Sequence, residues 1–177
     1  MAHPPGFDSE EAYKSSWDRR CKAHYCAMVG YRYHRKRQRF FDLLDKWTKA
    51  LSVIAGASLL ADPIKQHLPA VALSISAIGL LSLVFSYGDK KQSHKEVADA
   101  YALAVAKIEG LPTEQLTPAL IALWDAEVTT LNAKEPPQLH LLVTVCEREQ
   151  SIANGHPDHI PPIPLFKRAL ADWLSFS

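Results

Sequence analysis

The chain has little of what disulfide-bonded folds and common enzyme sites require. Its three cysteines, Cys21, Cys26 and Cys146, are too few and too unevenly spaced for a disulfide framework, so we expect reduced thiols in a cytosolic environment. The sequence lacks a phosphate-binding glycine loop, an HExxH metal motif and a nucleophile elbow. Cys21 and Cys26 also point away from each other on a helix, which disfavours a shared metal ion. We therefore expect no enzymatic activity, no cofactor and no bound metal.

Strand patterns and a secretory signal are also missing. No stretch alternates apolar and polar residues as a half-buried strand does, and there are no internal repeats. The start of the chain, MAHPPGFDSEEAY, is polar and acidic and lacks the apolar core of a signal peptide. We therefore expect an all-α fold in which any membrane insertion uses internal segments.

One internal stretch, Leu68–Gly88, contains no charged residue over twenty-one positions. A helix rises about 1.5 Å per residue, so this length matches the roughly 30 Å hydrocarbon core of a bilayer. The stretch also lacks the charged face that a surface helix shows. It predicts a transmembrane helix. The alternative is a helix buried on all sides by protein, for which so short a chain offers little material.

A second uncharged stretch, Ala50–Ala61, covers twelve residues and is too short to cross a bilayer alone. Extended back to Phe40 it gains length, with Trp47 at an interfacial position and Asp45 spaced to pair with Lys49. The two stretches are separated only by Asp62–His67, so their helices must be antiparallel neighbours. The pattern predicts a two-helix transmembrane hairpin.

Small residues recur along both predicted hairpin helices. In lipid such residues permit close helix approach, and this favours a packing role. Serine hydroxyls are also the polar groups that can line a narrow water-filled path, and the sequence does not separate the two roles. The candidate packing or pore-lining residues are Ser52, Gly56, Ala72, Ser76, Gly79 and Ser86.

Basic residues flank the hairpin on both sides. Residues 1–96 hold fifteen Lys or Arg against nine Asp or Glu, whereas residues 97–177 hold five against ten. Basic side chains interleaved with tyrosines can bind nucleic acid, but so close to an uncharged stretch they favour anionic lipid headgroups, and we expect no nucleic-acid partner. The candidate membrane-surface residues are Arg32, Arg35, Lys36, Arg37, Arg39, Lys90, Lys91 and Lys95.

The same charge asymmetry predicts a topology. The segment Asp62–His67 carries one lysine, and the basic residues gather on the other side of the hairpin. By the positive-inside rule both termini lie in the cytoplasm and Asp62–His67 faces outward across a bacterial inner membrane.

The rest of the chain is helical by pattern. Asp8 or Ser9 can cap a first amphipathic helix, whose buried face would be Tyr13, Trp17, Cys21, His24 and Met28, with a possible break at Gly30. Further helices are expected over Asp89–Ile108, from the cap Thr117-Pro118, and over Gln138–Ala153 and Leu165–Phe176. This organisation gives three segments: an amphipathic and basic helix (1–39), the hairpin (40–88) and a cytosolic helical region (89–177).

This order of parts, with the tract His34-Arg35-Lys36-Arg37 before the hairpin and Ser93-His94-Lys95 followed by Ala98 and Tyr101 after it, resembles the SLATT family of bacterial two-transmembrane effector domains. The resemblance covers roughly residues 10–175. It implies a non-enzymatic membrane effector of antiphage immunity that oligomerises and permeabilises the inner membrane when a trigger acts on it. The implied partners are the lipid bilayer, further copies of the chain, and an unidentified trigger such as a phage protein, a nucleotide-signalling enzyme or a sensor.

Two other functions fit parts of the sequence. A holin-like lysis or exclusion protein of a phage also uses a short hairpin with cytosolic termini, although the long helical region after residue 88 is untypical of that class. A soluble helical protein that binds nucleic acid would bury Leu68–Gly88 and use the basic run on its surface.

Overall fold

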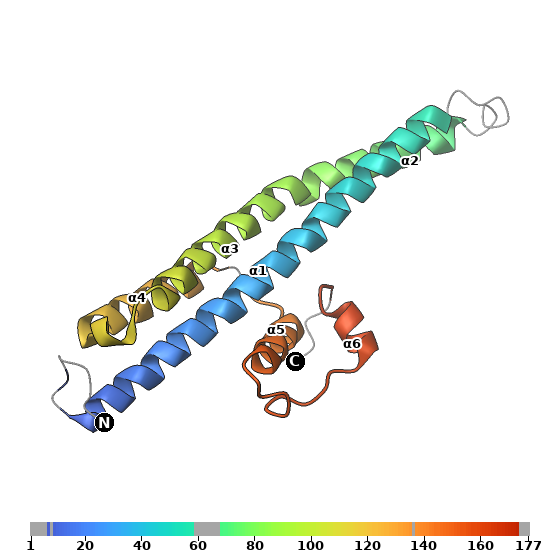
Figure 1. Ribbon diagram of the computed structural model, residues 1–177. Coiled ribbons are helices and arrows are strands. Elements are labelled where there is room, and N and C mark those ends of the chain that lie inside the picture. The colour runs from blue at the N-terminus through green and yellow to red at the C-terminus, as the bar shows by residue number, and fades with distance from the viewer. Residues whose placement is uncertain (1–6, 8, 59–67, 136, 174–177) are drawn as a thin grey trace. The chain divides into compact units, whose positions relative to one another are not determined.

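The computed structural model describes residues 7, 9–58, 68–135 and 137–173. The expected turn Asp62–His67 and the last residues of the expected C-terminal helix lie outside the described residues. The described residues form helices and loops without a strand, so the all-α prediction is confirmed. The elements are α1 (Glu10–Ser58), α2 (Leu68–Phe85), α3 (Tyr87–Glu109), the 3-10 turn η2 (Thr113–Gln115), α4 (Pro118–Lys134), α5 (His140–Ala153) and α6 (Leu165–Leu170) (Figure 1).

Among the described residues, no helix combines the length and the apolar character that crossing a membrane requires.

Contacts within the chain define two compact units. The first unit contains residues 1–35 and 96–177, and the second unit contains residues 36–95. This division differs from the three consecutive segments expected from the sequence. The reason is that the N-terminal part of α1 does not stand alone but shares a core with α3, α4 and α5.

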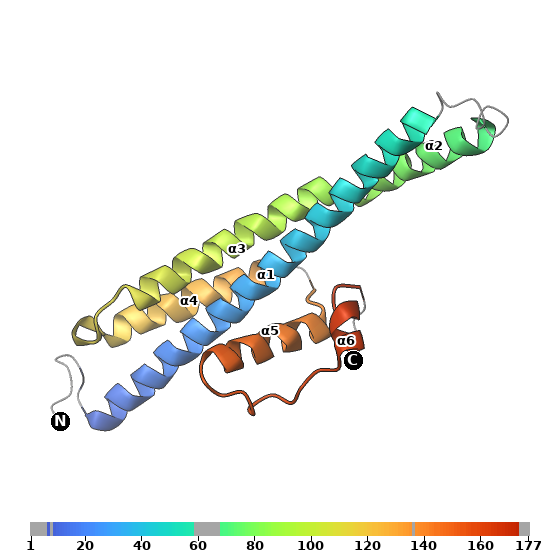
Figure 2. The same ribbon diagram turned by 45° about the vertical axis from the view of Figure 1, so that its right-hand side comes forward.

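The core of the first unit is arranged along α1, where α4 and α5 lie in Figures 1 and 2. Ala23 packs in one cluster with Ile108 of α3 and with Trp124 of α4. Ala27 packs in a second cluster with Tyr101 and Val128. A third cluster contains Tyr33 with Leu142, Val145 and Cys146 of α5. One helix therefore supplies residues to all three clusters.

The buried face of α1 differs from the expected aromatic stripe. Trp17 is 38% exposed and Cys21 is exposed, so the prediction is wrong for these two residues, whereas Tyr13 and Met28 pack against the core. Up to Gly30, the buried positions of α1 are instead small: Ser16, Ala23, Ala27 and Gly30. Small side chains let neighbouring helices approach closely, so the buried face carries few of the large apolar residues by which a stripe is recognised.

The expected break at Gly30 is also wrong, because α1 continues through it. A β-carbon at Gly30 would lie 2.7–2.9 Å from three ring atoms of Tyr101. Gly30 is therefore a close-approach position, at which the absent side chain makes room for a buried ring on α3.

We expect Gly30→Ala to lower the free energy of unfolding by about 1–3 kcal/mol, the usual cost of overpacking a filled core. Tyr101 is fully buried and its hydroxyl is held by Asn132 and Glu135, so a displacement of its ring disturbs these contacts. Urea unfolding followed by circular dichroism measures the change. Gly88→Ala is the matched control, since a β-carbon there meets nothing within 4 Å. Equal stability of the two variants would contradict the close contact.

Local helix signals are reproduced in the structure. Ser9 Oγ accepts a hydrogen bond from the Ala12 amide (3.1 Å) at the start of α1. Thr117 Oγ1 accepts one from the Leu120 amide (3.3 Å), with Pro118 in the first turn of α4. Both expected caps are therefore confirmed.

In the second unit, Ser86 separates α2 from α3. Its φ of 43° lies in the left-handed region, which a residue with a side chain seldom adopts. The end of the uncharged helix is therefore set by backbone conformation at Ser86, two residues before Gly88.

Candidate functional site

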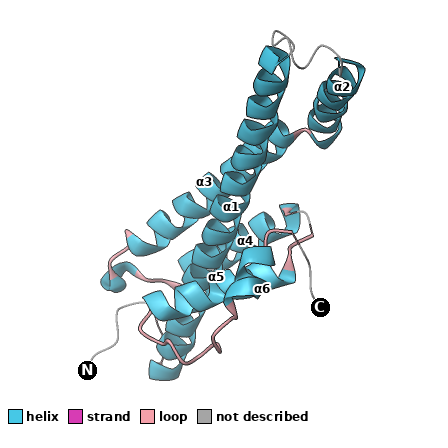
Figure 3. Cartoon of the chain, turned by 90° about the vertical axis from the view of Figure 1, so that its right-hand side faces the viewer, coloured by secondary structure: helices cyan, strands magenta, loops and turns pink. Residues whose placement is uncertain are grey.

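The second unit exposes an unusual number of large aliphatic side chains. They come from the last turns of α1 and from α2, two helices that run in opposite directions in Figure 3. Their exposed fractions range from 44% to 73%. Soluble monomers seldom expose large apolar patches without a binding role. We name as the apolar tip the residues Leu51, Val53, Ile54, Leu73, Leu80 and Val84.

Aromatic rings and cations gather in the same unit, where α1 meets the start of α3. The Phe41 ring stacks on His94 with centroids 5.5 Å apart, and Phe85 stacks on Tyr87 at 5.7 Å. The guanidinium of Arg37 lies 4.6 Å from the Phe41 centroid, and Lys90 Nζ lies 5.7 Å from both Phe41 and Phe85. Such contacts are attractive because the ring faces carry negative charge density. We name as the collar the residues Arg37, Phe41, Phe85, Tyr87, Lys90 and His94.

Two acidic side chains of the second unit, Asp42 and Asp45, are paired with lysines. Asp42 accepts ion pairs from Lys46 (2.7 Å) and Lys91 (2.8 Å). The expected pair between Asp45 and Lys49 is confirmed, with an N–O distance of 2.7 Å. Both carboxylates are therefore neutralised locally, and neither opposes the approach of an anionic surface to the collar.

The structure distributes the predicted basic residues over both units. Arg32 belongs to the first unit, where its Nε donates to the buried side chain of Gln150 on α5 (2.8 Å). Arg35 lies over the Tyr31 ring. Arg37 and Lys90 form part of the collar, and Lys91 joins α3 to α1 through Asp42. Lys36 is half-buried, and Arg39 and Lys95 are exposed.

The predicted small residues contact little within the chain. Ser52 is half-buried and donates to the Thr48 carbonyl (2.9 Å), whereas a β-carbon at Gly56 or Gly79 would meet nothing within 4 Å. The remaining members, Ala72, Ser76 and Ser86, are exposed. Any close helix contact at Gly56 or Gly79 must therefore come from outside the described chain.

The first unit contains a buried polar group that the sequence patterns did not reveal. The Glu135 side chain is 3% exposed, and its Oε1 lies 2.9 Å from Nε2 of the fully buried His34. The Tyr101 hydroxyl lies within hydrogen-bond distance of both Glu135 and Asn132, and Gln138 donates to Glu135. We name these residues, His34, Tyr101, Asn132, Glu135 and Gln138, the Glu135 cluster. It joins α1, α3 and the end of α4.

Charge in the Glu135 cluster is stabilised by hydrogen bonds. Burial by itself raises the pKa of Glu135, but hydrogen bonds from Tyr101 and Gln138, together with the adjacent His34 ring, outweigh it, so that the pKa lies below its ordinary value. Burial and the neighbouring Glu135 carboxylate raise the pKa of Tyr101. At neutral pH Glu135 is therefore an ionised acceptor and Tyr101 a neutral donor. This arrangement holds α1, α3 and the end of α4 together, and its reactive groups are buried.

Within the described part of the chain, no set of three His, Cys, Asp or Glu side chains is grouped so that it could hold a metal ion. No family model, curated protein or solved structure matches this sequence.

Proposed function

We propose that the second unit inserts into a bacterial inner membrane and that the protein is a non-enzymatic effector of antiphage immunity that permeabilises this membrane when triggered. The observation that carries the proposal is the exposed apolar tip in the same unit as a cationic and aromatic collar. The order of parts that resembles the SLATT family supports the same function.

The apolar tip favours lipid on energetic grounds. Full burial of one large aliphatic side chain is worth about 1.5–3 kcal/mol. The tip has six such side chains with 44–73% of each exposed, so their transfer into hydrocarbon contributes several kcal/mol in total. Helix α2 contains no ionised group that would oppose this transfer.

The collar suits the headgroup region of the same membrane. Aromatic rings with polar edges are enriched at membrane interfaces, and each Lys or Arg near an anionic surface adds about 1 kcal/mol. Arg37 and Lys90 supply such charges, and Arg39 and Lys95 are exposed nearby in sequence. In this orientation the basic flanks and both termini lie on the cytoplasmic side.

Permeabilisation requires several copies of the chain. Two packed helices leave only side-chain contacts between them and enclose no water path. The open positions Gly56 and Gly79 allow helices of other copies to approach closely, which is how helices associate in lipid. The proposed active form is therefore a homo-oligomer, and its assembly or opening is conditional on a trigger.

The test uses Gly79→Leu with Gly88→Leu as its matched control. A β-carbon at either position meets nothing within 4 Å in the described chain, so both positions are open where the new side chain begins. During phage infection of cells that express the protein, we expect wild type and Gly88→Leu to admit propidium iodide. Gly79→Leu is expected to fractionate with membranes but to admit no dye, because its side chain blocks contact between copies.

Crosslinking on the same cells reports the assembly. We expect higher-order species for wild type and Gly88→Leu and their loss for Gly79→Leu. A wild type that stays monomeric and leaves the cells impermeable under infection by every phage it protects against would refute the pore. A membrane-tethered scaffold would then be the better account.

A further inference from the structure

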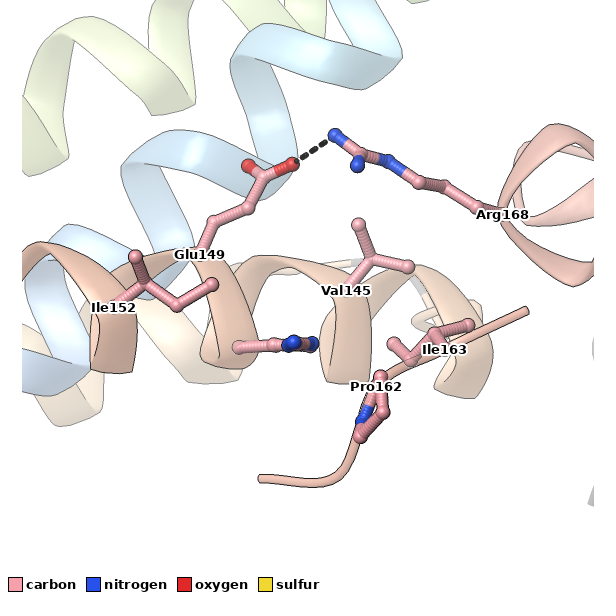
Figure 4. A pocket seen from close by; sticks show the side chains of 7 residues that line it. Val145, Glu149, Ile152, Pro162, Ile163 and Arg168 are labelled. Atoms are coloured by element: carbon pink, nitrogen blue, oxygen red, sulfur yellow. Dashed lines mark hydrogen bonds and ion pairs between the residues drawn. The ribbon is translucent and has the colours of Figure 1, made fainter. Parts of the chain in front are cut away.

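A small pocket lies in the first unit between α5 and the segment that leads into α6 (Figure 4). Its volume is about 180 Å³. The residues that line it are Val145, Arg148, Glu149, Ile152, Pro162, Ile163 and Arg168.

One side of the pocket is apolar. Val145 and Ile152 project from α5, and Pro162 and Ile163 come from the extended segment before α6 (Figure 4). Across the pocket, Arg168 of α6 donates to Glu149 of α5 at 3.0 Å. This ion pair fixes one guanidinium and neutralises its charge locally.

The guanidinium of Arg148 differs from that of Arg168 in its hydrogen bonding. Among the described residues, Arg148 Nη1 is buried and has no hydrogen-bond partner. A buried donor without a partner is unfavourable unless a ligand accepts a hydrogen bond from it. Because Glu149 offsets Arg168, the lining carries one positive charge in excess, and that charge belongs to Arg148.

We propose that this pocket binds a small monocarboxylate with a short, branched aliphatic body. Guanidinium and carboxylate match in charge and in planar geometry, and one ligand charge balances the one excess charge. The aliphatic body would contact Val145, Ile152 and Ile163. A dianion such as phosphate would instead hold a second charge against these apolar side chains at high cost.

The volume limits the size of the ligand. A cavity of about 180 Å³ suits a ligand of only several non-hydrogen atoms. Pockets for drug-sized ligands begin near 300 Å³. A whole nucleotide is therefore too large, whereas 3-methylbutanoate is of suitable size.

The test is calorimetric titration of the full chain with 3-methylbutanoate, its neutral isostere 3-methylbutanamide, and inorganic phosphate. We expect one saturable site for the carboxylate and at least about tenfold weaker binding of the amide, a factor that corresponds to about 1.4 kcal/mol. Phosphate is expected to bind no more tightly than the amide. Equal affinity for acid and amide, or tighter binding of phosphate, would overturn the proposal.

Variants assign the site to Arg148. Arg148→Met should lose the preference for acid over amide, yet melt at or above the temperature of wild type, because it removes a buried donor without a partner. Arg19→Met is the matched control, since Arg19 of the same unit pairs with Asp125 and lies outside the pocket lining. Its affinity should equal that of wild type.

A second variant, Ile152→Trp, should fill the pocket from a partly exposed position and weaken acid and amide alike. Wild-type affinity in both Arg148→Met and Ile152→Trp would refute the site. This inference goes beyond the proposed membrane function, and its failure would leave that function untouched.

Discussion

Glu135→Ala is expected to lower the free energy of unfolding by at least about 1–3 kcal/mol, the cost of leaving a buried polar group without its hydrogen-bond partner. The substitution leaves the His34 ring and the Tyr101 hydroxyl buried beside an empty space. Urea unfolding followed by circular dichroism measures the loss. Glu127→Ala on the same helix is the control, because its partner Lys107 is largely exposed and such pairs contribute about 0.2–1 kcal/mol. Comparable losses in both variants would contradict the role of the cluster.

The same carboxylate predicts a direction for the pH dependence. Hydrogen bonds hold the folded-state pKa of Glu135 below its ordinary value, so Glu135 stabilises the protein fully above its unfolded-state pKa of about 4.3. This contribution is lost as the pH falls through the folded-state pKa. As the pH is lowered below about 4, we expect the urea concentration at the unfolding midpoint to decrease more steeply for wild type than for Glu135→Gln. The variant has no carboxyl to protonate at this position.

Replacement of Leu80 and Val84 together by arginine is expected to abolish membrane association. These residues lie one turn apart on α2 and are 64% and 67% exposed, so the substitutions disturb little within the chain. An arginine near the centre of an inserting helix costs about 2.5–3.5 kcal/mol, and one near the helix end, as at position 84, costs less because its side chain can reach the headgroups. The pair also removes two of the six apolar side chains of the tip. Flotation with liposomes of anionic lipid measures the loss.

The control for this variant exchanges Leu103 and Leu123 of the first unit for arginine. Their exposed fractions, 63% and 64%, match those of Leu80 and Val84. The two variants therefore carry the same added charge at similarly exposed positions and differ in where these positions lie. We expect the control to float with liposomes as wild type does. If the α2 variant floats equally well, the apolar tip is not the membrane-binding element.

Features that depend on neighbouring residues could be predicted from the sequence. The cap at Thr117-Pro118 and the pair Asp45–Lys49 each involve residues within four positions of one another, and the structure reproduces both. The buried face of α3 with Tyr101 and Ile108 also follows from its helical period.

Features that depend on distant partners could not be predicted. From the sequence alone, Gly30 predicts a helix break, because the Tyr101 ring that lies against it comes from a distant part of the chain. His34 and Glu135 are far apart in sequence, and no spacing rule connects them. Arg32 resembles a lipid anchor in a basic run, yet it donates to Gln150 on another helix. The apolar character of α2 was evident from the sequence, because it needs no distant partner to be recognised.

The discontinuity of the first unit has a consequence for synthesis of the chain. The described core partners of α1 up to residue 35 lie mainly in residues 96–177, so the N-terminal helix leaves the ribosome long before the segments that cover it. At 5–20 residues per second, the intervening residues 36–95 delay the first possible contact by about 3–12 s. The second unit, which is continuous in sequence, is complete before the first unit can close. The nascent chain therefore presents its apolar helices to a membrane or a chaperone while the Glu135 cluster has yet to form.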